Sequence, residues 1–353
     1  MKRIAFALTA LIGGLALAGQ AQAACKDNWK ECAGKSWVDG NVMETPLGSK
    51  WWPHPMWGKG DQAGSTNWYK KAEVVKRGSD LIKTGQMYQL GQQYHSKMPM
   101  FGDRKFVLRI PGSPTGGPFG SNKIVWHDEF LATEISQAGT QFDALGHVGV
   151  QVGADGDKAN MRFYNGFTVA EFSNAYGLTK LGTEQLHPIF GRGVLIDLAA
   201  ARGVESMKAG ECASMADVKK ALQMQGMASF KFENGDAIMF RTGWEKFWED
   251  PKAYNAGQPG ICMDVARWVA EDVKAGVTGG DSWAATDPVP YPNEPACAFC
   301  VHSYLQTRHG IVNQENLRLK QLADDKAYVF AYVYSPVPIR GATGSIGSPL
   351  AIR

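Results

Sequence analysis

The sequence predicts an α/β fold, in which helices and apolar strands alternate along the chain. Short apolar runs of the kind that form buried strands recur at 87–94, 105–110, 193–200, 236–244 and 326–336. Apolar residues with helical spacing occupy 215–226 and 263–276, and the second segment leads directly into another apolar run at 277–283. A helix followed by a short apolar strand is the repeating unit of α/β proteins.

The length and composition are those of a globular protein with one large domain. The chain has 353 residues, of which 44% are hydrophobic and 20% charged. Its formal charge of +3 and the absence of Lys/Arg runs argue against a nucleic-acid partner. Because no repeat, low-complexity segment or Pro/Ser linker interrupts residues 86–353, we expect them to form a single domain.

The first 23 residues have the pattern of a secretory signal peptide. Lys2 and Arg3 form a basic start, residues 5–18 are almost wholly apolar or small, and 21–23 read Ala-Gln-Ala, a small-x-small cleavage site. The apolar run is too short to span a bilayer. We therefore expect a periplasmic or secreted protein that does not associate with membranes once residues 1–23 are removed.

Residues 24–85 are predicted to form an N-terminal arm that ends in a helix. Residues 24–60 are rich in Trp, Gly and Pro and show little periodicity, which indicates an extended arm lying over the body. Further on, apolar pairs at 74–75 and 81–82 have helical spacing, Ser65 or Thr66 can cap the helix, and Gly85 can end it.

Six cysteines follow the predicted cleavage site, and an even number in an exported chain predicts disulfides. The locally plausible pairs are Cys25 with Cys32 and Cys297 with Cys300, which leaves Cys212 with Cys262. A zinc site formed by the C-x-x-C segment 297–300 and His302 is an alternative, but an oxidising compartment favours the disulfide.

The segment 136–150, SQAGTQFDALGHVGV, concentrates polar groups beside apolar ones. In a strand, Gln137, Gly139, Gln141 and Asp143 would share one face, and His147 would follow the strand end. Two amides and a carboxylate on one face suit a cation or a polar substrate. The alternative is a strand whose polar face contacts water, with His147 a loop histidine.

His302 and Glu315, thirteen positions apart, form a second candidate pair, although neither residue is informative alone. The segment 241–244, RTGW, follows an apolar strand and is interpreted as a turn that requires its glycine. The sequence contains no G-x-S-x-G motif, so a serine nucleophile is not expected.

Taken in order, these segments resemble the cyclase-like metal-dependent hydrolases, a family that includes bacterial kynurenine formamidase and isatin hydrolase. The family signature is H-x-G-T-H-x-D-x-P-x-H, and residues 137–147 read Q-A-G-T-Q-F-D-A-L-G-H. The resemblance extends over roughly residues 57–335, through WGKGDQAGSTN at 57–67 and the family's E-N-L at 315–317. The matches are Gly139, Thr140, Asp143 and His147, whereas Gln137 and Gln141 replace two histidine ligands and Leu145 replaces proline.

The resemblance implies a mixed α/β body with a central β-barrel-like core and flanking helices, usually in an oligomer. It also implies a divalent metal ion, manganese or zinc. By position, Gln137, Gln141 and Asp143 occupy a first metal site, and His302 and Glu315 align with a second that Asp143 can bridge. An amide oxygen is a weaker ligand than imidazole, so the first site should favour manganese or magnesium over zinc. Retention of only the second site, or loss of the metal, are alternatives.

The function that follows is hydrolysis of a small amide or lactone, cyclic substrates included, by a metal-activated water. The resemblance places His147 as the catalytic histidine, acting as general base. Trp126 and Phe142 are candidates for the apolar walls of the substrate pocket, and ordinary core aromatics are the alternative. Two other functions stay open, namely a periplasmic solute-binding protein on a metal-free scaffold and an enzyme that cyclises or isomerises without hydrolysis.

Overall fold

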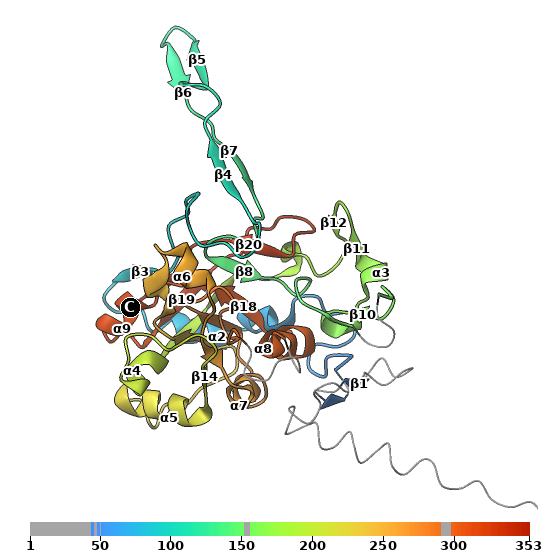
Figure 1. The fold of residues 1–353 in the computed structure, drawn as a ribbon, viewed down its shortest axis with the longest axis vertical. Helices are drawn as coiled ribbons and strands as arrows, with labels where there is room; N and C mark the ends of the chain where they lie inside the picture. The colour runs from blue at the N-terminus through green and yellow to red at the C-terminus, as the bar shows by residue number, and fades with distance from the viewer. Residues whose placement is uncertain (1–43, 46–47, 50, 152–155, 291–297) are drawn as a thin grey trace, which may run out of the picture.

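The computed structural model describes residues 44–45, 48–49, 51–151, 156–290 and 298–353. Its centre is a nine-stranded mixed sheet that curls strongly into a half-barrel (Figure 1). The four strands β18, β17, β15 and β13 are parallel, and the remaining strands join antiparallel on either side. The predicted mixed α/β fold with a barrel-like sheet is confirmed. In spatial order the strands are β20 (Gly344–Ile346), β8 (Gln141–Asp143), β18 (Val312–Glu315), β17 (Val277–Gly280), β15 (Ala237–Arg241), β13 (Ile189–Asp197), β19 (Val329–Tyr334), β21 (Leu350–Ile352) and β3 (Met87–Gln89).

Both faces of the sheet are buried, which explains why its central strands are apolar without interruption. Along β15, Met239 packs into one hydrophobic cluster, whereas Ile238 and Phe240 pack into a second one on the opposite face. Leu195 and Ile196 of β13 divide between the same two clusters. A strand with one solvated face would instead alternate apolar and polar residues.

Helices cover the two faces of the sheet. One face packs against α4, α5, α7 and the turns that follow α7 and α8, and the other against η2, α2 and α9. Both helices predicted at 215–226 and 263–276 are present, as α5 and as α7 continued by η6. The helices are η2 (Gly64–Lys70), α2 (Ala72–Ser79), η3 (Tyr164–Gly166), α3 (Val169–Phe172), η4 (Thr183–Gln185), α4 (Leu198–Arg202), α5 (Met215–Met224), η5 (Trp244–Phe247), α6 (Pro251–Asn255), α7 (Met263–Arg267), η6 (Trp268–Val273), α8 (Cys300–His302), η7 (Ser303–Arg308) and α9 (Lys320–Asp324).

Six two-stranded sheets lie outside the central one among the described residues. Two of them, β4 with β7 and β5 with β6, form a long hairpin that projects from the body (Figure 1). The pairs are β1 (Glu44–Thr45) with β2 (Gly48–Ser49), β4 (Phe106–Arg109) with β7 (Phe130–Thr133), β5 (Gly116–Phe119) with β6 (Ile124–Trp126), β9 (Val150–Gln151) with β10 (Met161–Arg162), β11 (Ser173–Asn174) with β12 (Gly177–Leu178), and β14 (Cys212–Ala213) with β16 (Gly260–Ile261).

The segment predicted as one helix from about 65 to 85 is divided in two. Lys71 is extended between η2 and α2, and the helical conformation ends at Ser79. The break lets Trp68 and Tyr69 enter the core, whereas Ile82 lies beyond the helix and is exposed. Tertiary burial therefore overrides the local helical spacing.

Residues 51–85 pack into the body of the protein and do not simply lie over it. Trp51 is almost completely buried, and α2 packs against β13. At that contact Gly78 lies so close to Gly191 that an added Cβ would be 2.6 Å from the Gly191 carbonyl carbon. The predicted signal peptide and the first part of the predicted arm, residues 24–43, lie outside the described residues.

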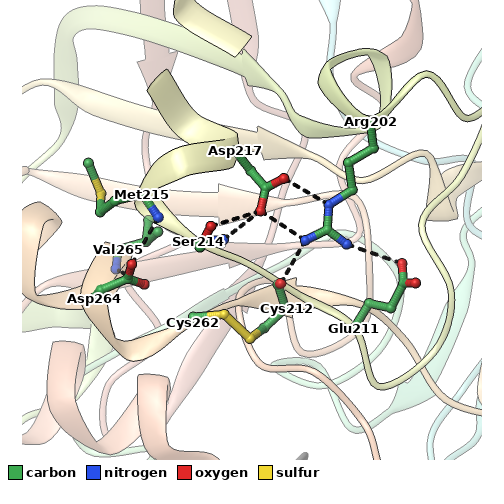
Figure 2. Close-up of a disulfide and its surroundings, with 9 residues drawn as sticks. All are labelled: Arg202, Glu211, Cys212, Ser214, Met215, Asp217, Cys262, Asp264 and Val265. Atoms are coloured by element: carbon green, nitrogen blue, oxygen red, sulfur yellow. Dashed lines mark hydrogen bonds and ion pairs between the residues drawn. A yellow bond between two sulfur atoms is a disulfide. The ribbon is translucent and has the colours of Figure 1, made fainter. Parts of the chain in front are cut away.

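The predicted disulfide between Cys212 and Cys262 is confirmed, with a Cα–Cα distance of 5.0 Å (Figure 2). It joins β14 to β16, which pair in parallel. The other two predicted pairs involve Cys25, Cys32 and Cys297, which lie outside the described residues. Within the described residues, the helices are too short or too polar to span a bilayer.

Candidate metal centre and pocket

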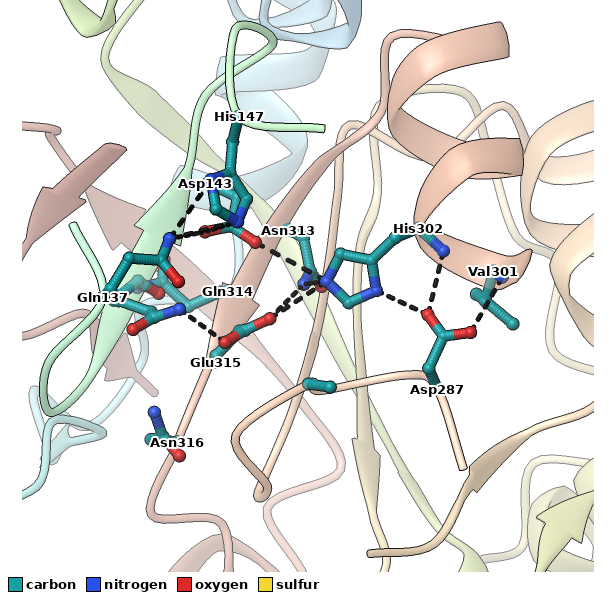
Figure 3. Close-up of polar contacts among 12 residues, drawn as sticks. Gln137, Asp143, His147, Asp287, Val301, His302, Asn313, Gln314, Glu315 and Asn316 are labelled. Carbon is teal, nitrogen blue, oxygen red and sulfur yellow. Dashed lines mark hydrogen bonds and ion pairs between the residues drawn. The ribbon is translucent and has the colours of Figure 1, made fainter. Parts of the chain in front are cut away.

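The candidate site lies where β8 and β18 run antiparallel beside α8 (Figure 3). In this register Asp143 is opposite Asn313, and Gln141 is opposite Glu315. His302 reaches the same place from α8. One ligand atom from each of Asp143, His302 and Glu315 lies within 4.8 Å of the others. The structure thus brings together residues that are far apart in the sequence.

The prediction that Gln137 to Asp143 form one strand is wrong in its first half. Only Gln141–Asp143 is extended, and residues 135–140 form turns. Gly139 has a φ of +65°, and a Cβ there would be 2.3 Å from the ring of Tyr94. This turn, which requires glycine, carries Gln137 back toward the site.

A hydrogen-bonded clamp fixes β8 on the end of β18. The side-chain amide of Asn316 donates to the carbonyl of Gly139 at 2.6 Å, and the Thr140 hydroxyl donates to the carbonyl of Asn316 at 2.8 Å. Tyr254 donates to the Asn316 side-chain oxygen at 2.7 Å. The Gly-Thr and Glu-Asn segments therefore position the candidate ligands that adjoin them.

Asp287 sets the orientation of His302. One carboxylate oxygen of Asp287 is 2.5 Å from Nδ1 of His302, and the backbone N–H groups of Val301 and His302 also donate to this carboxylate. Nδ1 therefore carries the proton, and Nε2 faces Glu315 Oε1 at 3.0 Å and Asp143 Oδ2 at 3.6 Å. A carboxylate that holds an imidazole in this way is typical of metal-ligating histidines.

Burial and mutual proximity shift the pKa values of the three groups. Burial, assisted by the charge of Asp143, raises the pKa of Glu315 to about 8. Burial alone would lower the pKa of His302, but its close contacts with the carboxylates of Asp143, Asp287 and Glu315 raise that pKa well above its usual value. Burial opposes ionisation of Asp143, yet His147 and His302 hold its pKa below the usual range. The three buried side chains therefore stabilise positive charge placed between them, whether protons or a cation.

The donor set fits a divalent cation. Asp143 is completely buried, and its Oδ2 atom has no hydrogen-bond partner among the described residues. The same holds for Oδ1 of the neighbouring Asn313. A buried carboxylate oxygen without a partner is costly unless a cation binds it. Asp143, His302 and Glu315 would hold such an ion.

The two glutamines at this site act as hydrogen-bond donors. The amide nitrogen of Gln141 donates to Glu315 Oε2 at 2.6 Å. The amide nitrogen of Gln137 lies 3.5 Å from Asp143 Oδ1 and 3.1 Å from Nε2 of His147. Both side chains are therefore beside the cluster, as predicted from the sequence, and binding of a metal by their oxygens stays a prediction.

His147 lies at the edge of the cluster, with its Nε2 atom 4.0 Å from Asp143 Oδ1. Burial lowers its pKa below 6.5, although Asp143 partly opposes the shift. Its imidazole is therefore neutral near pH 7 and able to accept a proton. The His147 side chain is 25% exposed and lines the pocket, so the ring is accessible from it.

The cluster opens into a cavity of about 220 Å³ with an aromatic wall. The rings of Phe101 and Trp283 stack with centroids 4.7 Å apart, and the Arg104 guanidinium lies 5.4 Å from the centroid of Phe101. Nε1 of Trp283 is buried and has no hydrogen-bond partner among the described residues. The residues that line the cavity are Phe101, Arg104, Gln137, Gln141, His147, Val148, Trp283, Ala284, Phe299, His302 and Glu315.

The two aromatic residues predicted to line the pocket lie elsewhere. Phe142 points away from the cluster into the core, where its ring packs against Tyr334 with centroids 5.0 Å apart. Trp126 lies in β6 of the projecting hairpin and is 42% exposed. Phe142 thus matches the alternative interpretation of a core aromatic.

Sequence reasoning missed several residues of this site. Asn313 could have been found, because it lies two positions before Glu315 in the same short strand and shares its face. Asp287 could not, because it lies in the irregular segment 284–290 without a recognisable pattern. Phe101 and Arg104 precede β4 in a loop and have no periodicity that would distinguish them.

Comparison with known protein families identifies the family of this chain. The family model described as "Putative cyclase" matches residues 88–287, more than half of the chain. The protein therefore belongs to this cyclase family. No curated relative matches the sequence at a significant level.

Among solved structures, the crystal structure of a novel cyclase is similar at 28% identity and a TM-score of 0.72, covering 84% of this chain and 98% of that one. Isatin hydrolase A from Ralstonia solanacearum, at 17% identity and a TM-score of 0.54, covers 76% of this chain and 92% of its own. Isatin hydrolase A from Labrenzia aggregata, bound to benzyl benzoate, is similar at 14% identity and a TM-score of 0.53. The match covers 81% of this chain and 98% of that one. These two isatin hydrolases share the fold.

Proposed function

We propose that this protein is a metal-dependent hydrolase that opens a small cyclic amide or lactone. The observation that carries the proposal is the buried cluster of Asp143, His302 and Glu315, which lies beside a neutral His147 in an aromatic cavity. A divalent ion bound there would polarise the substrate carbonyl and lower the pKa of water. Manganese or zinc suits the mixed carboxylate and imidazole donors.

The residues of the chain supply the other requirements of the reaction. His147 accepts a proton from the attacking water and returns it to the leaving nitrogen or oxygen. Gln137 hydrogen-bonds the imidazole and keeps it beside Asp143. The stacked rings of Phe101 and Trp283 form an aromatic wall that suits a flat substrate.

The comparisons support a cyclic amide as the first substrate to test. One structural relative, 18% identical, is an isatin hydrolase bound to the product analogue thioisatinate. We further propose that the enzyme acts outside the cytoplasm, which the signal-peptide pattern of residues 1–23 and the Cys212–Cys262 disulfide support.

The test is hydrolysis measured with defined metal content. The full chain is expressed with its own leader and purified from the periplasm, and its mass shows whether the mature chain starts at Ala24. After chelation, a panel of aromatic lactams, lactones and open-chain amides is assayed without metal, with Mn²⁺ and with Zn²⁺. We expect metal-dependent ring opening. The Asp143→Asn variant should lose metal and activity while remaining folded, and Asp264→Asn, which lies outside the site, should lose neither.

Hydrolysis that persists in chelated protein and in Asp143→Asn would contradict metal dependence. Tight binding of a panel compound without metal or turnover would instead support a solute-binding protein. Conversion without uptake of water would indicate a cyclising or isomerising enzyme.

A further inference from the structure

Arg104 is the only lysine or arginine among the described residues that line the cavity beside the candidate metal centre. Its guanidinium donates a hydrogen bond to the carbonyl of Phe101 at 3.3 Å and forms no ion pair within the described residues. A nearby carboxylate, Glu134, is exposed to water and accepts from the backbone N–H of Lys105 at 2.8 Å, so it does not neutralise Arg104. The cavity therefore contains a positive charge without a paired carboxylate in the described chain.

A tight turn holds this guanidinium in place. Gly102, inside the turn, has a φ of +65°, a conformation that favours glycine. The turn brings the guanidinium back over the ring of Phe101, 5.4 Å from its centroid, and the same ring stacks with Trp283. Because the ring contact and the backbone hydrogen bond both restrict the guanidinium, Arg104 is part of the cavity wall and not a freely moving surface side chain.

The charge of Arg104 is unfavourable for the metal centre by itself. Burial lowers the pKa of His147, and the charge of Arg104 acts in the same direction, so the guanidinium is close enough to affect the imidazole. A positive charge at that range also repels a divalent ion bound by the Asp143, His302 and Glu315 cluster. An anionic group of the ligand, bound next to the guanidinium, would offset this repulsion.

We propose that Arg104 selects substrates that carry a carboxylate on their ring, away from the bond that is hydrolysed. The proposal rests on the proposed function, since that function supplies the ring and the bond. A guanidinium keeps free donors after its hydrogen bond to Phe101 and can hold a carboxylate in a bidentate manner. Within the described residues the guanidinium has no hydrogen bond or ion pair with the metal-ligand cluster. The carboxylate is therefore assigned to a substituent of the substrate and not to the group that ring opening forms at the metal.

The cavity limits the rest of the substrate. Its volume of about 220 Å³ lies below the range of roughly 300–1,000 Å³ that drug-sized ligands occupy, so the substrate is a single small ring system. The stacked rings of Phe101 and Trp283 suit a flat, aromatic one. Arg104 is partly exposed, so a carboxylate bound to it keeps part of its hydration and avoids the full cost of burying a charge. The substrate class is thus an aromatic lactam or lactone with a ring carboxylate.

The experiment compares charged and neutral forms of one ring system. The probes are isatin, its ring-carboxylated isomers, and the matching carboxamides, which keep the size of the substituent but not its charge. The full chain, loaded with Mn²⁺, is assayed for ring opening at pH 8. For the best isomer we expect KM to be about 10–100-fold lower than for its carboxamide at similar kcat, because a contact remote from the reacting bond stabilises substrate and transition state alike.

Variants of Arg104 test the origin of this preference. In Arg104→Gln the ratio of the two KM values should fall about tenfold or more, and Arg104→Lys should retain part of it because the charge remains. Arg109→Gln is the matched control, since it also removes an exposed arginine bonded to a backbone carbonyl, here that of Leu108, but one that does not line the cavity. It should leave the ratio unchanged, and both glutamine variants should melt at the temperature of the unaltered chain.

Equilibrium binding provides a measurement that does not depend on turnover. Isothermal titration calorimetry of the carboxylated probe and its carboxamide gives their Kd values in chelated and in Mn²⁺-loaded protein. The carboxylated probe should bind about tenfold or more tightly than the carboxamide to the loaded protein. This difference should shrink in Arg104→Gln, and it should shrink in the unaltered chain as NaCl is raised, because the ion pair is partly exposed.

The results separate this proposal from the proposed function. Charge-selective binding that Arg104→Gln abolishes, without ring opening, would support the role of Arg104 and contradict the hydrolase. Ring opening without charge preference, or with a preference that survives in Arg104→Gln, would overturn the role of Arg104 and leave the hydrolase. A variant that changes only inhibition by the ring-opened product would also overturn it, because the guanidinium would then bind the newly formed carboxylate. Absence of both binding and ring opening for every probe would contradict both proposals.

Discussion

Asp287 is a small part of the candidate site, yet three N–H groups converge on its carboxylate. In Asp287→Asn the volume is kept, but one side-chain oxygen becomes an NH₂ group that faces a backbone or imidazole N–H. The orientation of His302 should then be lost in part. We expect metal affinity to fall about 10–100-fold.

Competition with a chromogenic chelator measures this change. The Asp264→Asn protein, altered at a carboxylate outside the site, serves as the matched control. An unchanged affinity in Asp287→Asn would show that the imidazole is fixed by other contacts.

His147 provides a second residue-scale expectation. His147→Gln should retain metal but slow turnover by about 10²–10⁴-fold, the usual contribution of positioned proton transfer. Because burial lowers the pKa of His147 below 6.5, the neutral base persists to a lower pH than in a free histidine. Activity of the unaltered enzyme should therefore stay high at pH 6.5 and decline only below it, and a pH profile of kcat/KM checks this.

If metal content falls instead in His147→Gln, the residue is a ligand. If turnover per folded molecule is unchanged, the residue has no role in proton transfer.

For single residues, the sequence predicted the candidate metal ligands better than the side chains around them. Asp143, Glu315 and His302 were found because a motif of fixed spacing and a resemblance joined them. Asp287 and the aromatic wall were not found, because long-range contacts in irregular segments bring them to the site. Trp126 was proposed for the pocket because small-molecule pockets have apolar walls, but it lies on the projecting hairpin, where it is 42% exposed.

Among the elements, α5 shows how a helix start depends on one carboxylate (Figure 2). Asp217 accepts from the backbone and hydroxyl of Ser214 and forms an ion pair with Arg202 at 2.9 Å. The hydrogen bond from Arg202 lowers the pKa of the Asp217 carboxyl group to about 2, against 3.8 in an unfolded chain. Its contribution to stability is therefore complete above pH 3.8 and is lost as the pH falls through about 2.

Asp217→Asn should reduce the free energy of unfolding at pH 7. The difference from the unaltered protein should shrink between pH 4 and pH 2, because the aspartate is protonated over that range. Urea unfolding at pH 7, 4 and 2.5 measures it, with Arg202→Gln removing the same ion pair from the other side. A difference that is independent of pH would assign the effect of Asp217 to the helix cap alone.

The elements that sequence reasoning placed correctly are those buried on both faces, such as β13 and β15, and the capped helix α5. The segment 64–79 was misjudged because helical spacing does not reveal that Trp68 and Tyr69 must reach the core. The turn before β8 was misjudged for a related reason: an even spacing of polar residues imitates a strand, and only the positive φ of Gly139 shows otherwise.

For the whole molecule, metal binding and folding should be coupled. The three candidate ligands come from β8, α8 and β18, so an ion bound by them ties together distant parts of the chain. A ligand that binds only the folded state at 100 times its Kd adds about 2.7 kcal/mol to the free energy of unfolding.

The pH dependence of this effect has a definite sign. Without metal, Glu315 has a pKa of about 8, above its usual 4.5, so the folded state loses stability as pH rises from 4.5 to about 8. Metal binding must displace this proton and the one on His302. The increase in melting temperature with Mn²⁺ or Zn²⁺ should therefore be larger at pH 8 than at pH 6. Calorimetry at both values tests this, and Asp143→Asn should show no increase.

The whole-molecule architecture was predictable because apolar runs without alternation require a sheet that is covered on both sides. The projecting hairpin was not predictable, because its segment 105–110 has the same apolar composition as a core strand. Composition indicates how much free energy a strand would gain from burial, but not whether the strand is buried in the fold, and Leu108 and Ile110 are exposed.

The pocket wall and the projecting hairpin are one continuous piece of chain, since Phe101 and Arg104 immediately precede β4. A substrate that holds this wall would also restrain the base of the hairpin. Anything that restrains the hairpin would in turn bias the position of the wall, and thermodynamic reciprocity requires the two effects on binding free energy to be equal.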